Sequence, residues 1–176
     1  MPRICSRALT HFKRVDPHFY RATAPHHTSL PAQLPAKWTR AQLFISLVRI
    51  VVAQQLGTAA ARSIFLRVKE ACKGRVSPEV ILATRPATLR AAGLSRAKVK
   101  TLRAIAQAIT DHSLDLLSLK KISEADAIEK LTTIWGLGPW SVEMFLMNSL
   151  GRADVFSVGD LGLVRAIETL YNLPKN

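Results

Sequence analysis

The chain has 176 residues, of which 48% are apolar, which is enough for the core of one domain or two small lobes and argues against extensive disorder. Its 25 Lys and Arg residues against 12 Asp and Glu residues leave a net charge of +13, which favours a polyanionic partner such as nucleic acid. On charge alone, a basic protein without such a partner is the alternative, and no uncharged apolar run is long enough to span a membrane.

The first 40 residues form a proline-rich segment with one predicted short helix. They hold five of the nine prolines and four of the five histidines, and "VDPHFYRAT" is the stretch most typical of a helix. His26 and His27 have no Cys or acidic partner at ligand spacing, so a surface loop is favoured over a metal site. Cys5 and Cys72 match no metal or redox spacing, which indicates free thiols in a reducing compartment. The basic start lacks the apolar core of a secretory signal, and a role in organelle targeting stays open.

The region after residue 40 begins with a strongly apolar helical pattern. In "AQLFISLVRIVVAQQ", apolar residues recur at i, i+4 and i+7, and a second row widens the stripe, so this helix is predicted to be largely buried. The first row is Leu43, Leu47 and Ile50, and the second is Phe44, Val48 and Val51. Gly57-Thr58 is predicted to end this helix and to start another that runs to about Lys73.

Three more helix starts are predicted from serine caps. Ser77 precedes Pro78 and Glu79, a pattern that suits the first turn because proline is tolerated there and an acid is favoured. Ser95 follows the turn residue Gly93, and Ser123 opens the helix that leads to the next glycine-rich turn. No run shows a convincing strand alternation, so the sequence predicts an all-α fold with about eight to ten short helices.

The stretch "LTTIWGLGPW" predicts a tight helical hairpin. Gly136 can take the positive φ that such a turn needs, Gly138 lets another backbone approach closely, and Pro139 suits the first helical position. The helix that follows would begin with unpaired N–H groups, which form a ready site for a phosphate. An ordinary α-hairpin without a ligand is the alternative.

The same turn offers main-chain oxygens. The carbonyls of Thr132, Ile134 and Leu137 are candidate ligands for a monovalent cation, Na⁺ or K⁺, and no other cofactor is expected.

An aromatic residue and two thioethers share one face of the helix after the hairpin. Trp140, Met144 and Met147 fall at i, i+4 and i+7. Such a stripe ordinarily packs in a core, but beside a base-binding pocket it could stack on an electron-poor purine.

Four motifs occur in an order that matches one family. The hairpin is followed by "GRADVF" and by Asp160, twenty residues beyond Trp140. Upstream, "LVRIVVAQQLGTAAARSI" resembles the pattern I-x-x-Q-Q-x-S-x-x-A-A, "AAGLSRAKVKTLRAIA" contains G-L-S-x-x-K, and "DPHF" stands near the start. Over residues 15 to 173 the chain therefore resembles the helix-hairpin-helix (HhH-GPD) DNA glycosylases, in their 3-methyladenine (alkylpurine) branch.

The resemblance implies two small helical lobes with the active site in the cleft between them. Residues 1–40 would be an N-terminal segment packed on the C-terminal lobe, 41–130 the central lobe, and 131–176 the hairpin and catalytic segment. Only 16 residues follow Asp160, where the family continues with one or two further helices, so this last segment is expected to be short.

By resemblance, the chain is a monofunctional glycosylase that flips an alkylated purine, such as 3-methyladenine or 7-methylguanine, out of duplex DNA and hydrolyses its glycosidic bond. Asp160 would be the catalytic carboxylate and Gln55 the wedge inserted into the DNA. The base pocket would comprise Trp140, Met144, Gln54 and Phe44. The phosphate contacts would come from Gly136, Leu137, Gly138, Trp140 and Ser141.

The residue after the hairpin proline separates two classes of glycosylase. Trp140 stands where lyase-type relatives carry lysine, and without that amine no Schiff base forms. Val142 and Val158 replace a usual alanine and proline, and both substitutions look tolerable. The alternative functions are a non-catalytic or inactive truncated DNA-binding protein and, disfavoured because iron–sulfur cysteines are also missing, a lyase for oxidised bases.

The expected partner is double-stranded DNA that contains damaged bases. The protein is expected to be a monomer and not to associate with a membrane. The expected location is the cytoplasm or nucleoid of a bacterium, or the nucleus of a eukaryote.

Overall fold

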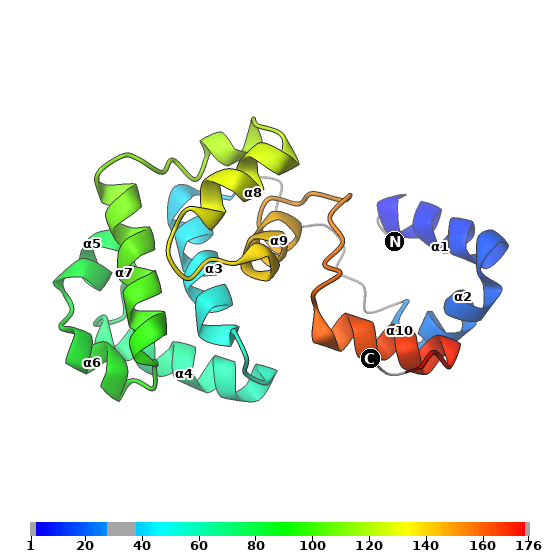
Figure 1. Ribbon diagram of the computed structural model, residues 1–176, viewed down its shortest axis with the longest axis horizontal. Helices are drawn as coiled ribbons and strands as arrows, with labels where there is room; N and C mark the ends of the chain where they lie inside the picture. Colours follow the sequence, from blue (N-terminus) through cyan, green and yellow to red (C-terminus); the bar gives the residue numbers. More distant parts are fainter. Residues whose placement is uncertain (1–2, 28–37, 175–176) are drawn as a thin grey trace. The chain divides into compact units, whose positions relative to one another are not determined.

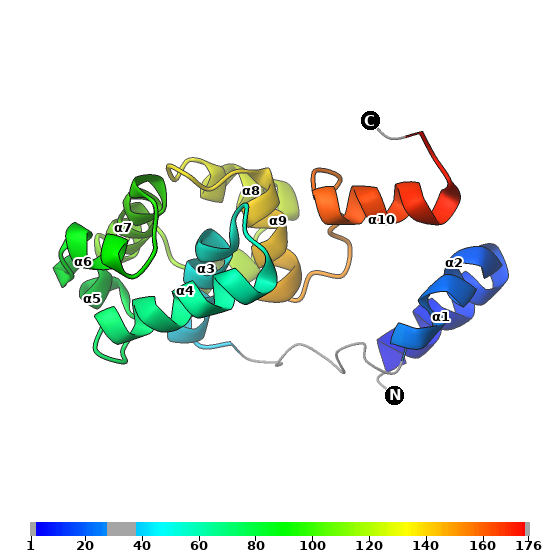
Figure 2. The same ribbon diagram turned by 90° about the horizontal axis from the view of Figure 1, so that it is seen from below.

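The computed structural model describes residues 3–27 and 38–174, and all regular elements in these ranges are helical, which confirms the predicted all-α class (Figures 1 and 2). The elements are α1 (Arg3–Val15), α2 (Pro17–Thr23), η1 (Ala24–His26), α3 (Arg40–Ala53), α4 (Thr58–Ala71), α5 (Pro78–Ala83), α6 (Pro86–Ala91), α7 (Arg96–Thr110), η2 (Ser118–Lys120), α8 (Glu124–Thr132), α9 (Pro139–Asn148) and α10 (Leu161–Tyr171). No helix in the described ranges has both the length and the apolar character needed to cross a bilayer.

The chain forms two compact units. Trp38–Ser157 is the larger unit, and Met1–Lys37 together with Val158–Asn176 forms the smaller one. The expected boundary at residue 130 is therefore not where the structure divides the chain. Because α8 packs on α9 and α9 packs on α3, the hairpin joins the central helices and buries its apolar side there.

Helix α3 lies at the centre of the larger unit. It packs against α4, α7 and α9, and Figure 1 shows it between α7 and α9. Both predicted apolar rows are buried, except that Ile50 is only partly covered. The helix starts with a capping box, in which Thr39 accepts from the Gln42 amide and the Gln42 side chain accepts from the Thr39 amide.

The predicted serine caps are confirmed. The hydroxyl oxygens of Ser77, Ser95 and Ser123 accept hydrogen bonds from amides three residues later, at 3.4, 3.2 and 3.1 Å. Helix α4 begins at Thr58, as predicted, and ends at Ala71, slightly before the expected end. These starts are local signals, and they set the lengths of the helices that surround α3.

The smaller unit consists of α1, α2, η1 and α10. Asp16 caps the predicted helix α2 by accepting from the Phe19 amide at 2.9 Å, and it also accepts from the Tyr171 hydroxyl on α10. These two hydrogen bonds lower the pKa of Asp16, the Phe19 amide having the larger effect. His18 bonds the Leu170 carbonyl at 2.8 Å, so the N-terminal helices contact α10.

His26 and His27 lie in and just after the 3-10 turn η1. The His27 ring bonds the Thr23 hydroxyl at 2.9 Å. In the part of the chain that the structure describes, no three His, Cys, Asp or Glu side chains gather where they could hold a metal ion.

Candidate functional site

The loop between α8 and α9 is a tight turn that accepts only glycine at one position. Gly136 has φ +85°, in the left-handed region that favours glycine. A Cβ atom there would lie 1.9 Å from the Thr101 hydroxyl oxygen on α7. On the other side of the turn, Leu137 is only 3% exposed, and its amide donates to the Ile134 carbonyl at 3.0 Å. The hairpin is therefore held by α7 and by the core.

The start of α9 is open to a ligand. Gly138 is the N-cap residue, no side chain of the described residues caps the helix there, and a Cβ atom at Gly138 would meet nothing within 4 Å. Pro139 occupies the first helical position, where its missing N–H group costs little. The amides of the first turn and the positive end of the helix dipole together suit an anion. The predicted phosphate contact has the geometry it needs, and phosphate binding itself stays a prediction.

Gln54 ends α3 and ties it to the hairpin. Its side-chain amide nitrogen donates to the Gly136 carbonyl at 3.0 Å and to the Ser141 hydroxyl at 2.8 Å. The structure thus brings three predicted site residues together. Ser141 is only 2% exposed, so its contribution to a phosphate site would come from its main-chain amide and not from its hydroxyl.

Gln55, the predicted wedge, is exposed and has a left-handed backbone with φ +56°, which is uncommon outside glycine. The chain directly before it is fixed by Lys98 of α7, whose ammonium group donates to the carbonyls of Val52 at 2.9 Å and Gln54 at 2.8 Å. This cation satisfies the carbonyl end of α3 and opposes the negative end of its dipole. Burial lowers the pKa of Lys98.

The sequence analysis did not assign a role to Lys98, although a signal was available. Lys98 shares its face of α7 with Thr101, Leu102 and Ile105, at spacings of three, four and seven residues, and all three are buried. A lysine on a buried face of a helix needs a partner, and here the partners are main-chain carbonyls.

Trp135 is a second residue that the sequence analysis missed. Its ring, 46% exposed, lies directly before Gly136, and the Lys100 ammonium group stands 4.1 Å from the ring centroid. This cation–π contact connects α7 with the outer surface of the hairpin.

The predicted base-pocket residues on α9 fall into two groups. Trp140 and Met144 are half-buried, so part of each side chain can reach a ligand. Met147, which the spacing places on the same face, packs against the hydrophobic core. The core interpretation therefore holds for Met147.

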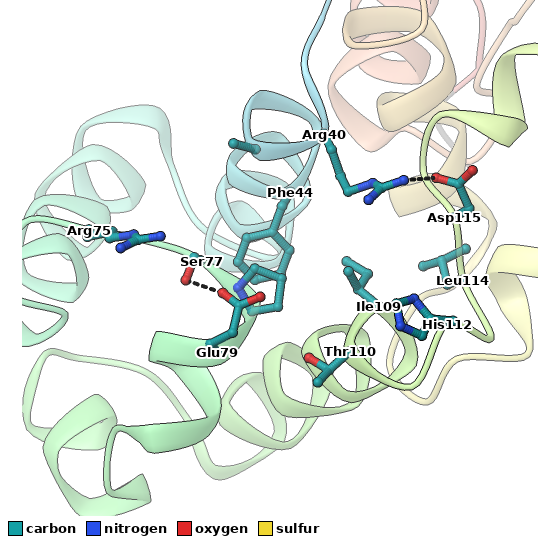
Figure 3. Close-up of a pocket in the computed structure, with 12 residues that line it drawn as sticks. Arg40, Phe44, Arg75, Ser77, Glu79, Ile109, Thr110, His112, Leu114 and Asp115 are labelled. Carbon is teal, nitrogen blue, oxygen red and sulfur yellow. Dashed lines mark hydrogen bonds and ion pairs between the residues drawn. The ribbon is translucent and has the colours of Figure 1, made fainter.

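Phe44 is not brought to the hairpin. It is 1% exposed and lies at the opposite end of α3 from Gln54, about 15 Å along the helix at 1.5 Å per residue. Figure 3 shows Phe44 beside a different cavity of about 420 Å³, which is lined by Arg40, Arg75, Glu79, His112 and Asp115 among others. The ten-residue step from Phe44 to Gln54 already places the two side chains at opposite ends of the predicted helix, so this part of the predicted pocket came from the resemblance and not from the spacing.

The predicted cation ligands retain accepting capacity. The Ile134 carbonyl accepts one hydrogen bond, from Leu137, and thus keeps a second lone pair. Within the described residues, the carbonyls of Thr132 and Leu137 accept no hydrogen bond from the turn or from α9. Carbonyl oxygens of this kind fit a hard monovalent cation.

Asp160 belongs to the smaller unit, where it caps α10. Its carboxylate accepts from the Leu163 amide at 2.9 Å, and Gly162 leaves room beside it, because a Cβ atom there would approach the carboxylate to 3.1 Å. The larger unit ends at Ser157, in the loop between α9 and α10. The Ser157 hydroxyl donates to the Glu143 carboxylate at 2.5 Å and so anchors this part of the loop to α9.

Comparison with known proteins identifies the family of the chain. The family model described as "HhH-GPD superfamily base excision DNA repair protein" matches residues 48–176. DNA-3-methyladenine glycosylase 1 of Schizosaccharomyces pombe is 36% identical over 132 residues, and the DNA-3-methyladenine glycosylase of Saccharomyces cerevisiae is 32% identical over 170 residues. The alignments cover 73% and 90% of this chain, but only 58% and 57% of those two relatives.

A solved structure shows the same fold. The 3-methyladenine DNA glycosylase Mag1 of S. pombe, in complex with abasic DNA, superposes with a TM-score of 0.81 at 32% identity, covering 96% of this chain and 82% of that one. The matched family model spans well over half of the chain. The chain therefore belongs to the HhH-GPD superfamily of base excision DNA repair proteins.

Proposed function

We propose that this HhH-GPD protein is a monofunctional DNA glycosylase that hydrolyses the N-glycosidic bond of alkylated purines, such as 3-methyladenine and 7-methylguanine, in duplex DNA. The product would be a free base and an abasic site, the first step of base excision repair. The observation that carries the proposal is the hairpin, in which Gln54 and Thr101 fix an uncapped helix start toward solvent. The similarity to named 3-methyladenine glycosylases supports the choice of substrate.

In this proposal the hairpin binds the DNA backbone. Gly136, Leu137 and Gly138 let the phosphate approach, and the main-chain amides of Trp140 and Ser141 would donate to its oxygens. A Na⁺ or K⁺ ion held by the carbonyls of Thr132, Ile134 and Leu137 would add positive charge on the same side of the phosphate.

The damaged base would leave the stack and meet the α9 face. Gln55 would fill the gap in the duplex, and its place after the fixed end of α3 makes it a rigid wedge. Trp140 and Met144 would contact the flipped base, and the positive charge of an alkylated purine favours the π face of Trp140. Alkylated purines also need less assistance, because their glycosidic bonds are already weakened.

Asp160 would act on the sugar. Cleavage of the bond builds positive charge on the deoxyribose ring, which an ionised carboxylate would stabilise while it orients water. Since Trp140 replaces the lysine of lyase-type enzymes, the reaction would stop at the abasic site. We expect the protein to act as a monomer in the compartment that holds the DNA.

Methylated duplex DNA provides the test. The wild-type protein should release free methylated purines, and Asp160→Asn should lower the rate by at least about 100-fold, the usual size of a general acid–base contribution. Duplex binding should be retained by Asp160→Asn. Binding without release by the wild type would overturn the proposal in favour of a non-catalytic DNA-binding protein. Strand nicking without added alkali would indicate a lyase instead.

A further inference from the structure

A basic groove lies between α6 and α7, next to the hairpin. It has a volume of about 330 Å³ and is lined by Pro86, Arg90, Arg96, Val99, Lys100 and Arg103, so four of its six lining residues are cationic and none is acidic. Figure 1 shows α6 beside the N-terminal part of α7, and the two helices are in contact.

The cations of α7 form a stripe. Arg96, Lys100 and Arg103 are spaced at i, i+4 and i+7, so they share one face of the helix. Like charges at this spacing repel one another and destabilise a helix. Such a stripe therefore suits a partner that neutralises it.

Of the four cationic residues that line the groove, two form no ion pair or side-chain hydrogen bond with the described residues. Arg103 donates to the carbonyls of Ile81, Leu82 and Thr84, so its guanidinium holds the end of α5. By contrast, Arg90 and Arg96 form no ion pair or hydrogen bond through their side chains with any residue that the structure describes. Both residues are exposed, so their guanidinium groups can reach a ligand.

Lys100 joins the groove to the hairpin surface. Its ammonium group lies 4.1 Å from the centroid of the Trp135 ring, and Trp135 precedes Gly136 in the turn. A polyanion held at the hairpin could therefore extend toward the groove on α7, whose lining contains no acidic residue. The four-residue step from Arg96 to Lys100 spans about 6 Å at 1.5 Å per residue. That length equals the rise of about two phosphates along one strand of B-DNA.

We propose that this groove is a second phosphate-binding surface, which holds the DNA backbone beside the segment bound at the hairpin. Arg90, Arg96 and Lys100 supply the charge, and the surface sets the affinity for any duplex and not the choice of base. This inference rests on the proposed function, since its ligand is duplex DNA.

The test is the salt dependence of binding to an undamaged duplex, measured by fluorescence anisotropy between 50 and 200 mM KCl. For the double variant Arg90→Ala/Arg96→Ala, the slope of log K against log salt should become shallower by about 1.8, which is 0.9 for each of two phosphates. The affinity near 100 mM salt should fall on the order of ten-fold. The variant Arg90→Lys/Arg96→Lys should keep most of the slope.

The matched control is Lys120→Ala/Lys121→Ala, which removes the same charge from two exposed residues outside the groove. If both alanine variants change the slope equally, the groove is not a phosphate site. Base release from methylated DNA is measured on the same proteins. Release by the wild type with no specific effect of Arg90 and Arg96 would overturn only the groove. A groove-specific slope without any base release would support the groove and overturn the proposed glycosylase.

Discussion

The larger unit contains two helical hairpins, α6–α7 and α8–α9. Each has a glycine with positive φ in its turn, but the second helix begins differently in the two hairpins. Gly93 and Gly136 have φ values of +104° and +85°, and each lies close to a neighbouring helix. After Gly93, helix α7 is closed by Ser95, whose hydroxyl accepts from the Lys98 amide. After Gly136, helix α9 begins at Gly138 without a capping side chain.

Because one helix start is capped and the other is open, the two hairpins would bind an anion through different groups. Helix α7 satisfies its own first amides and presents cationic side chains, whereas α9 has no Lys or Arg and presents backbone amides. Side chains adapt to the position of a phosphate, but amides at a helix start fix it. The two hairpins can therefore divide the work between affinity and register.

The largest expected effect is that of a methyl group at the turn glycine. Gly136→Ala should lower the free energy of unfolding by about 3 kcal/mol, because strained φ and overlap with Thr101 add. Gly93→Ala should cost only about 1–2 kcal/mol, because its nearest neighbour, the Arg67 guanidinium, would lie 2.9 Å from the new Cβ atom and not 1.9 Å as at Gly136. Urea denaturation measures both variants. Equal losses would break the distinction between a tight and a permissive turn.

A smaller loss of stability is expected from replacing Lys98 of the α6–α7 hairpin, which holds the end of α3 directly before Gln55. Lys98→Met should destabilise the fold by about 2 kcal/mol, since it removes two charge-assisted hydrogen bonds to the end of α3 but also relieves the burial of a charge. The catalytic rate at saturating DNA should fall as well, because Gln55 loses its fixed position. Lys100→Met is the control and should cost at most about 1 kcal/mol, the value of an exposed cation–π contact. Equal effects of the two variants on unfolding would contradict the role of Lys98.

The smallest effects test the open and closed helix starts directly. Gly138→Ser should stabilise the protein by a few tenths of a kcal/mol, because serine caps better than glycine, yet its hydroxyl should occupy amides that serve the phosphate and so weaken DNA binding. Ser95→Ala should do the reverse, costing about 1 kcal/mol of stability with little change in DNA affinity. Calorimetry and anisotropy would record both. DNA binding by Gly138→Ser as tight as that of the wild type would show that these amides are not the phosphate site.

The parts of the fold that could be predicted are those encoded within four residues of chain. The caps at Ser77, Ser95 and Ser123 depend on a hydroxyl and an amide three residues later, and the turn at Gly136 depends on its φ. Sequence spacing reports such interactions directly.

The parts that could not be predicted join distant segments. Gln54 bonds Gly136, 82 residues away, and Lys98 bonds the carbonyl of Val52, 46 residues away. For Phe44 the spacing predicted burial correctly, but which side chains line a pocket beside the hairpin depends on how the helices pack. The packing of the hairpin on α3 is another such contact between distant segments.

The burial of Leu137 has a consequence for motion. Because this residue of the turn belongs to the same core as α3 and α7, the hairpin cannot open without exposing that core. The Leu137 amide, which donates to the Ile134 carbonyl, should therefore exchange with solvent far more slowly than the open amides at the start of α9. A binding surface of this kind loses little conformational entropy when DNA arrives, so its rigidity contributes to affinity before any contact is made.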